Sequence, residues 1–259
     1  MKTAWKVVVG VLAALLVLLL VAEFGLRAYM AHEIRTDIAA QNPDVSQARD
    51  AEVSFGPSPI TLGLMRGTIP HMAMKTPSTL SINGDSFTGQ PAADIRVDNL
   101  HVNNGRQVAE NFVLTTELPD DYVRVILEQQ LSQSLQQAGA GRGSLLDGLL
   151  TVSSVTSHPE NGTFSIGVSG GAADLELRPK MDGDRLTFDA SSTKLFGFQL
   201  PESATAGITG AIDKGMQDSV TGELAVRDFT VVDGGLNVTL AGHDVDMEKM
   251  AQTAPVASR

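Results

Sequence analysis

The sequence contains no cysteine, has few aromatic residues and is short of basic ones. Without cysteine, the 259-residue chain has no disulfide, no thiolate metal site and no cysteine nucleophile. Aromatic residues make up only 5% of it, which argues against a platform for stacking bases. Lys2 and Lys6 are two of its 19 basic residues, whereas all 30 acidic residues follow them, so residues 23–259 carry a net charge of −13. Nucleic acid is therefore not an expected partner, because phosphate binding needs an excess of lysine and arginine.

The first 22 residues have the pattern of a membrane anchor or signal sequence. Residues 7–22 contain no charged side chain and follow two lysines, and Trp5 is placed as an interface anchor. A cleaved signal peptide begins in the same way, but Leu20 would then occupy the −3 position, where a small residue is needed. We predict an uncleaved N-terminal membrane helix, with residues 23–259 on the extracytoplasmic (periplasmic) side of the cell membrane. Cleavage is the alternative.

Beyond residue 43 the pattern changes from helical to alternating. Residues 23–41 repeat apolar side chains every four positions and predict a helix that continues from the membrane. Short alternating runs follow, separated by Asn-Gly and Asp-Gly pairs, and these predict antiparallel strands joined by hairpins. The pairs begin at Asn83, Asn104, Asn161, Asp182 and Asp233.

Two amphipathic helices are predicted among the strands. One begins at Pro119 and the other at Pro201, and each proline is followed by an acidic residue that suits the first turn. We therefore predict an α+β fold in which a strongly curved antiparallel sheet wraps around long amphipathic helices. A single exported domain is expected over residues 23–245, followed by a flexible tail at 246–259.

One motif suggests catalysis, and none suggests a metal site. Residues 167–171 match G-x-S-x-G, which in hydrolases places the serine on a turn between a strand and a helix. Here the residues after Ser169 alternate like a strand and Pro179 opposes a helix, so we favour a glycine-rich hairpin. A hydrolase using Ser169 and His243 is the alternative. The five histidines lack metal-ligand spacing, and we expect no metal and no cofactor.

Residues 53–84 contain no acidic side chain, although the exported part is acidic overall. Arg66, His71 and Lys75 lie in this window among leucines and methionines. We interpret the three basic residues as candidates for binding a lipid headgroup, and the flexible apolar residues as contacts for acyl chains. The alternative is a buried loop and strand from which acids are excluded for stability.

Several short motifs resemble a known family. They are residues 22–27 (AEFGLR), 53–59 (VSFGPSP), 64–67 (LMRG), the strand pair at 93–102, the helix entry at 121–122, the hairpin at 175–188 and the run 235–242. In this order, over residues 22–245, they resemble the LmeA-like phospholipid-binding family of actinobacterial cell-envelope proteins. The resemblance implies a tubular lipid-binding fold with an apolar groove, binding of anionic phospholipid, and a role in the maturation of envelope lipoglycans. It implies no catalytic motif.

A lipid-binding function requires a large apolar surface. Each buried methylene contributes about 0.8 kcal/mol, so a lipid leaves its bilayer only for comparable apolar contact. The candidate groove residues are Phe55, Leu62, Leu64, Met65, Met72, Met74, Phe112, Leu114, Val123, Leu127, Leu131, Phe196 and Phe198. Our leading hypothesis is a membrane-tethered envelope protein that binds anionic phospholipid and is not an enzyme. The alternatives are the serine hydrolase and a structural envelope protein that binds a protein partner.

Overall fold

Most of the described chain forms antiparallel sheet. The computed structural model describes residues 20–36, 50–103, 105–137, 151–182, 185–195, 198–199 and 224–253. The first sheet has six strands, and each neighbouring pair is antiparallel. In spatial order they are β1 (Glu52–Ser54), β2 (Thr68–Thr76), β5 (Ala93–Asn103), β6 (Arg106–Pro119), β13 (Gly235–Asp246) and β12 (Leu224–Val232).

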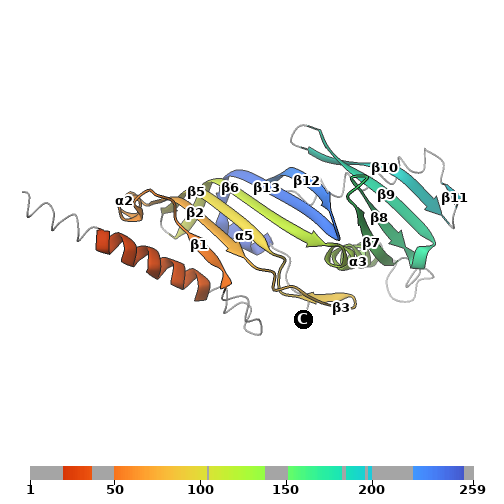
Figure 1. Cartoon of the computed structure of the whole chain (residues 1–259), viewed down its shortest axis with the longest axis horizontal. Coiled ribbons are helices and arrows are strands. Elements are labelled where there is room, and N and C mark those ends of the chain that lie inside the picture. The colour runs from red at the N-terminus through yellow and green to blue at the C-terminus, as the bar shows by residue number, and fades with distance from the viewer. Residues whose placement is uncertain are drawn as a thin grey trace, which may run out of the picture.

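A second antiparallel sheet lies beside the β12 edge of the first (Figure 1). It contains five strands, in the spatial order β11 (Phe198–Gln199), β10 (Arg185–Leu195), β9 (Ala173–Asp182), β8 (Thr163–Val168) and β7 (Val152–His158). A separate short hairpin is formed by β3 (Ser81–Asn83) and β4 (Ser86–Thr88). The predicted pairs Asn83-Gly84, Asn161-Gly162 and Asp233-Gly234 lie at turns between antiparallel strands, so these three turn predictions are confirmed. Asn104 and Gly183, from the other two pairs, lie outside the described residues.

The described helices are few. Residues 20–36 are helical, and the others are α2 (Ile60–Met65), α3 (Asp120–Gln137) and α5 (Met247–Thr253). The molecule is elongated (Figure 1): the 20–36 helix and α2 lie at one end, the first sheet lies in the middle, and the second sheet lies at the other end.

The apolar face of the first sheet supplies part of two separate cores. Because side chains alternate along a strand, the register places Met72, Val97 and Phe112 in one row on this face. Around them lies the N-terminal core, which receives side chains from the 20–36 helix and from the residues flanking α5. Its buried members are Ala31, Phe55, Ile60, Ile69, Val97, Leu100, Ala109, Phe112 and Val245.

The second core joins the two sheets. Residues of β12 and β13 pack against the second sheet, and three phenylalanines, Phe164, Phe188 and Phe229, contact one another with ring centroids 5.8 to 6.3 Å apart. The buried members are Val152, Val155, Phe164, Leu177, Leu186, Phe188, Val226, Leu236 and Val238. One side of helix α3 borders this core, and its other side packs Tyr122 and Val125 against Phe87 of the β3–β4 hairpin. Helix α3 is therefore held between this hairpin and the second core.

The prediction of a mainly antiparallel α+β fold is confirmed, but wrapping of the sheet around long helices is not. Helix α3 starts at Asp120, one residue later than predicted, because Pro119 is the last residue of β6, and the helix packs between other elements. The helix predicted from Pro201, and residues 1–19 of the predicted membrane segment, lie outside the described residues. Within the described ranges, no helix has the length and apolar character needed to cross a membrane.

The segment predicted as a flexible tail, residues 246–259, begins with ordered structure. Asp246 is buried, and its carboxylate accepts hydrogen bonds from the backbone N–H groups of Glu248 and Lys249 at the start of α5. Met247 and Met250 pack against the N-terminal core. Helix α5 is therefore part of the folded domain, while residues 254–259 lie outside the described chain.

Two phenylalanines test this assignment of the core. Phe112 is 1% exposed, whereas Phe24 is 69% exposed. We expect Phe112→Ala to lower the free energy of unfolding by about 3–5 kcal/mol, because it leaves a cavity beside Val97. Phe24→Ala should change it by less than about 0.5 kcal/mol. Urea unfolding of the full chain in detergent, followed by circular dichroism, measures both. Equal losses would contradict the assignment.

Candidate functional site

The 20–36 helix is joined to α2 by one buried carboxylate. Glu23 accepts hydrogen bonds from the backbone N–H of Ile60 (2.7 Å) and from the N–H and hydroxyl of Thr61 (3.0 and 2.9 Å). Arg27, one helical turn later, donates to the same carboxylate at 2.8 Å. Its guanidinium also donates to the carbonyls of Phe55, Gly56 and Ser58. The pair thus fixes residues 55–61 against the helix.

These contacts lower the pKa of Glu23. Burial by itself would raise the pKa, but the hydrogen bonds from Thr61, Ile60 and Arg27 favour the charged form and outweigh it. The net effect is a pKa of about 2, below the ordinary value of 4.5. Glu23 therefore stays ionised at neutral pH, where it supplies the first-turn N–H groups of α2 with an acceptor.

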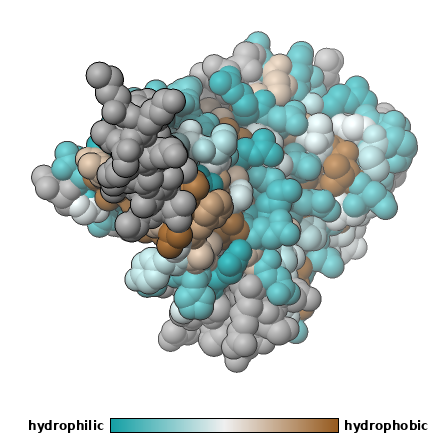
Figure 2. Space-filling view, turned by 60° about the vertical axis from the view of Figure 1, so that its left-hand side comes forward, coloured by the Kyte–Doolittle hydropathy of each residue, from teal (hydrophilic) through white to brown (hydrophobic). Residues whose placement is uncertain are grey.

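Helix α2 presents apolar side chains to solvent. Ile60 and Gly63 face the protein, and a Cβ at Gly63 would collide with the carbonyl oxygen of Thr68. The remaining large side chains, Leu62, Leu64 and Met65, are exposed, Met65 at 84%. Figure 2, in which this end of the molecule comes forward, shows hydrophobic surface gathered there. This location differs from a groove enclosed by the fold.

The three predicted headgroup residues occupy two different settings. Arg66 follows α2 and is exposed, and its guanidinium forms no hydrogen bond or ion pair with another described residue. His71 and Lys75 lie on one face of β2, directly opposite Asp98 and Asp94 of β5. The imidazole of His71 lies 2.5 Å from the Asp98 carboxylate, and the ammonium of Lys75 lies 3.8 Å from that of Asp94. Arg66 is therefore the member whose charge no described carboxylate offsets.

The predicted groove residues that the structure describes are distributed over four places. Phe55, Met72, Phe112 and Leu114 belong to the N-terminal core or pack against it. Met74 lies on the same face of β2 as Met72, half-buried between Val53 and Ile95. Val123, Leu127 and Leu131 of α3 pack at the border of the second core. Leu62, Leu64 and Met65 of α2 are exposed. Phe198 lies in β11, and Phe196 lies outside the described residues.

Helix α3 is fixed to the second sheet by two acidic side chains. Asp120, its first residue, accepts hydrogen bonds from the backbone N–H and the hydroxyl of Ser157 in β7, at 2.9 and 2.6 Å. Two turns later, Glu128 accepts one from the backbone N–H of Val152 at 2.6 Å. Between them, the apolar side of α3 stays half-buried and borders the second core. This border is the part of the described structure best suited to contact an acyl chain.

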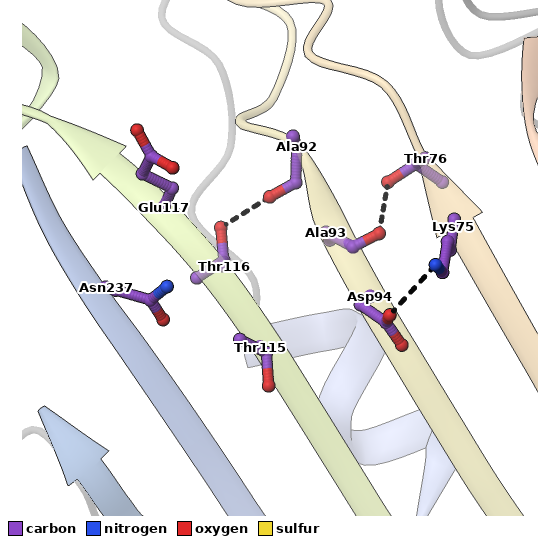
Figure 3. A pocket seen from close by; sticks show the side chains of 9 residues that line it. All are labelled: Lys75, Thr76, Ala92, Ala93, Asp94, Thr115, Thr116, Glu117 and Asn237. Atoms are coloured by element: carbon purple, nitrogen blue, oxygen red, sulfur yellow. Dashed lines mark hydrogen bonds and ion pairs between the residues drawn. The ribbon is translucent and has the colours of Figure 1, made fainter.

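A cavity of about 290 Å³ lies elsewhere and is lined by none of the groove candidates. Figure 3 shows it over β2, β5, β6 and β13, with Lys75 and Asp94 on one side and Glu117 and Asn237 on the other. Thr116 donates to the carbonyl of Ala92 at 2.8 Å. The cavity is bordered by the charged residues Lys75, Asp94 and Glu117.

The hydrolase alternative lacks the required geometry. Ser169 begins a short 3-10 turn, with φ of +55°, that leads from β8 directly into β9, so no helix follows the serine. His243 lies in β13 of the other sheet, opposite Asn111. Among the described residues, no three His, Asp or Glu side chains are placed to hold a metal ion.

Sequence reasoning did not single out Glu23 and Arg27. The motif AEFGLR contains the signal, a Glu–Arg pair four residues apart, which lie next to each other on a helix. No local pattern identifies their partners 28 to 38 residues later.

Comparison with known proteins gives one match. A family model described as LmeA-like phospholipid-binding matches residues 21–241. No curated protein and no solved structure shows a significant match. The matched range includes the Glu23 contacts, α3, the second sheet, and the first sheet apart from the last five residues of β13.

Glu23 predicts a specific pH dependence of stability. Because its pKa is lower in the folded chain than in the unfolded one, its stabilisation is complete above about pH 4.5 and is lost as pH falls toward about 2. We expect Glu23→Gln to lower the free energy of unfolding at pH 7 by about 1–2 kcal/mol, because hydrogen bonds to a charged group contribute about this much to stability. The deficit should shrink between pH 4.5 and 2. Urea unfolding at several pH values measures it.

Glu33→Gln is the matched control, because Glu33 is exposed on the same helix. It should leave the stability close to wild type throughout. A Glu23→Gln deficit that stays constant down to pH 2 would show that the charge of Glu23 is not responsible.

Proposed function

The chain belongs to the LmeA-like phospholipid-binding family, and from this membership we propose that it is a membrane-tethered cell-envelope protein that binds anionic phospholipid. The family match over residues 21–241 is the observation that carries the proposal. Tethering by residues 1–22, an extracytoplasmic location and a part in lipoglycan maturation belong to the same proposal. They rest on the sequence pattern and the family resemblance.

The border of the second core supports contact with acyl chains. Partly buried hydrophobic side chains from α3, from the second sheet and from β12 and β13 surround it. Such side chains retain exposed apolar area, which a hydrocarbon chain removes from water at a gain of about 25 cal/mol per Å². The members that the argument uses are Leu127, Leu131, Ile166, Leu175, Phe229 and Leu240.

Arg66 and its surroundings support a preference for anionic headgroups. Its guanidinium has no carboxylate partner among the described residues, and the stretch from residue 53 to residue 84 contains no acid. A guanidinium binds phosphate through paired N–H groups. The net charge of −13 over residues 23–259 opposes approach to an anionic membrane. A tether overcomes that repulsion by holding the domain at a high effective concentration near the surface.

Retention of lipid tests this function. We expect the full chain, purified in detergent and washed extensively with lipid-free detergent, to keep phospholipid in stoichiometric amount. Extraction into organic solvent and mass spectrometry measure it. Anionic species should be enriched relative to the lipids of the starting membrane.

The control is a chain with the same N-terminal segment but an altered second core. Leu127→Asp places a charge among the partly buried side chains and should lower retained lipid several-fold, while circular dichroism reports whether the fold persists. Gln129→Asp, on the same helix, is the matched change outside the apolar set. Lipid retained equally by all three chains, or by none, would contradict a binding site beside α3.

A further inference from the structure

We infer that the end of the molecule formed by the first turns of the 20–36 helix and by α2 is a docking surface for a phospholipid bilayer. This apolar end comprises Leu20, Val21, Phe24, Tyr29, Leu62, Leu64, Met65 and Val102. Through these side chains the domain lies in the bilayer interface rather than moving freely at the end of a tether. The inference rests on the proposed membrane attachment but not on lipid being held beside α3.

The distribution of exposed hydrophobic side chains carries the inference. Among the residues whose side-chain burial the structure describes, eight large hydrophobic side chains are exposed, and they are those of the apolar end. Val102 belongs to it because its backbone N–H donates to the carbonyl of Gly67, next to α2, at 2.8 Å. Within the second sheet, β7, β8, β9 and residues 186–190 of β10 contribute none, and neither does the β3–β4 hairpin. Exposed large apolar side chains gathered at one end of a folded domain mark a site of interaction.

The apolar end is preformed. Glu23 and Arg27 bind residues 55–61 through six hydrogen-bond contacts that start from one helical turn, and this holds α2 beside the helix. Gly63 packs against Thr68 and Pro70, so α2 cannot rotate its exposed side chains inward. A preformed apolar surface loses little conformational entropy on docking.

Charge at this end suits a membrane interface. From residue 20 to residue 29 the charged side chains are Glu23 and Arg27, and they bind each other and residues 55–61. The outward positions hold Ala22, Gly25 and Ala28 beside the larger apolar residues. Arg66 follows Met65 directly, so a guanidinium lies next to the most exposed apolar side chain. Apolar side chains at the acyl boundary with a cation at the phosphate level are the pattern of interfacial membrane binding.

The sequence outside the described residues identifies the occupant as a bilayer. The uncharged run of residues 7–22 enters the described structure at Leu20, within the apolar end itself. A bilayer that takes up this run necessarily lies against the same end of the domain. The second sheet lies at the opposite end of the long axis (Figure 1). Docking therefore orients the domain with its second core away from the membrane surface.

Spin labelling tests the docking, and the absence of cysteine provides unique labelling sites. Met65→Cys reports on the apolar end, and Glu160→Cys, in the turn after β7 with a side chain 66% exposed, is the control at the other end. The labelled full chain is reconstituted into vesicles of phosphatidylcholine and phosphatidylglycerol. Power saturation compares accessibility to oxygen, which concentrates in the bilayer, with accessibility to a water-soluble nickel chelate.

We expect the oxygen-to-nickel accessibility ratio to be several-fold higher at residue 65 than at residue 160. A ratio at residue 65 equal to that at residue 160 would overturn the inference, because it describes a domain that is tethered but not docked. Protection of residue 65 from both reagents would also overturn it, since that result describes a covering protein or a second copy of the chain. Docking observed in a chain that retains no phospholipid would support this inference while contradicting the proposed lipid site.

A variant that introduces negative charge into α2 provides a second measurement, and it leaves the labelled position unchanged. With the label at Val102→Cys, the pair Leu62→Glu and Met65→Glu should move the label into water and lower its ratio to that of residue 160. Asn161→Glu, at the far end, should leave the ratio unchanged. Circular dichroism checks that each variant is folded. An unchanged ratio in the folded double variant would contradict a role for α2 in docking.

Discussion

The fold depends on covering one long apolar face, which the alternation of side chains along β5, β6 and β13 creates. These strands span 11, 14 and 12 residues, so their apolar face is longer than any one described element can cover. At one end the 20–36 helix and α2 cover it, and at the other end the second sheet covers it. The result is an elongated domain with two cores that share one sheet, rather than a compact body around a single core (Figure 1).

This arrangement separates two roles that the sequence analysis had assigned to one groove. The α2 residues and Arg66 lie at the end where the chain emerges from its uncharged N-terminal run, whereas the α3 residues border the second core. In our proposals, contact with a bilayer and contact with a single lipid chain therefore fall to opposite ends of the long axis. The sheet between them connects the two ends through continuous backbone ladders between its longer strands.

Local signals predicted much of the fold. Asn83-Gly84 and Asp233-Gly234 mark turns at which glycine adopts φ of +61° and +71°, a conformation that needs no side chain to be accommodated. Pro119 precedes a helix whose first residues are acidic, as predicted. The candidate site was less predictable. The lack of acids in residues 53–84 indicated an unusual segment, but Asp94 and Asp98, which pair with Lys75 and His71, lie outside that window on the next strand.

The sequence by itself determined the strands, the hairpin turns, the start of α3 and the family, because each depends on residues within a few positions or on motifs in a fixed order. Only the tertiary structure decided which distant segments meet. It placed β13 beside β6, the carboxylate of Glu23 at the N-terminus of α2, and the exposed apolar side chains of residues 20–29 and 62–65 at one end. The physical reason is that these contacts depend on how apolar faces cover one another across more than 30 residues of chain, and side-chain periodicity records which face is apolar but not what covers it.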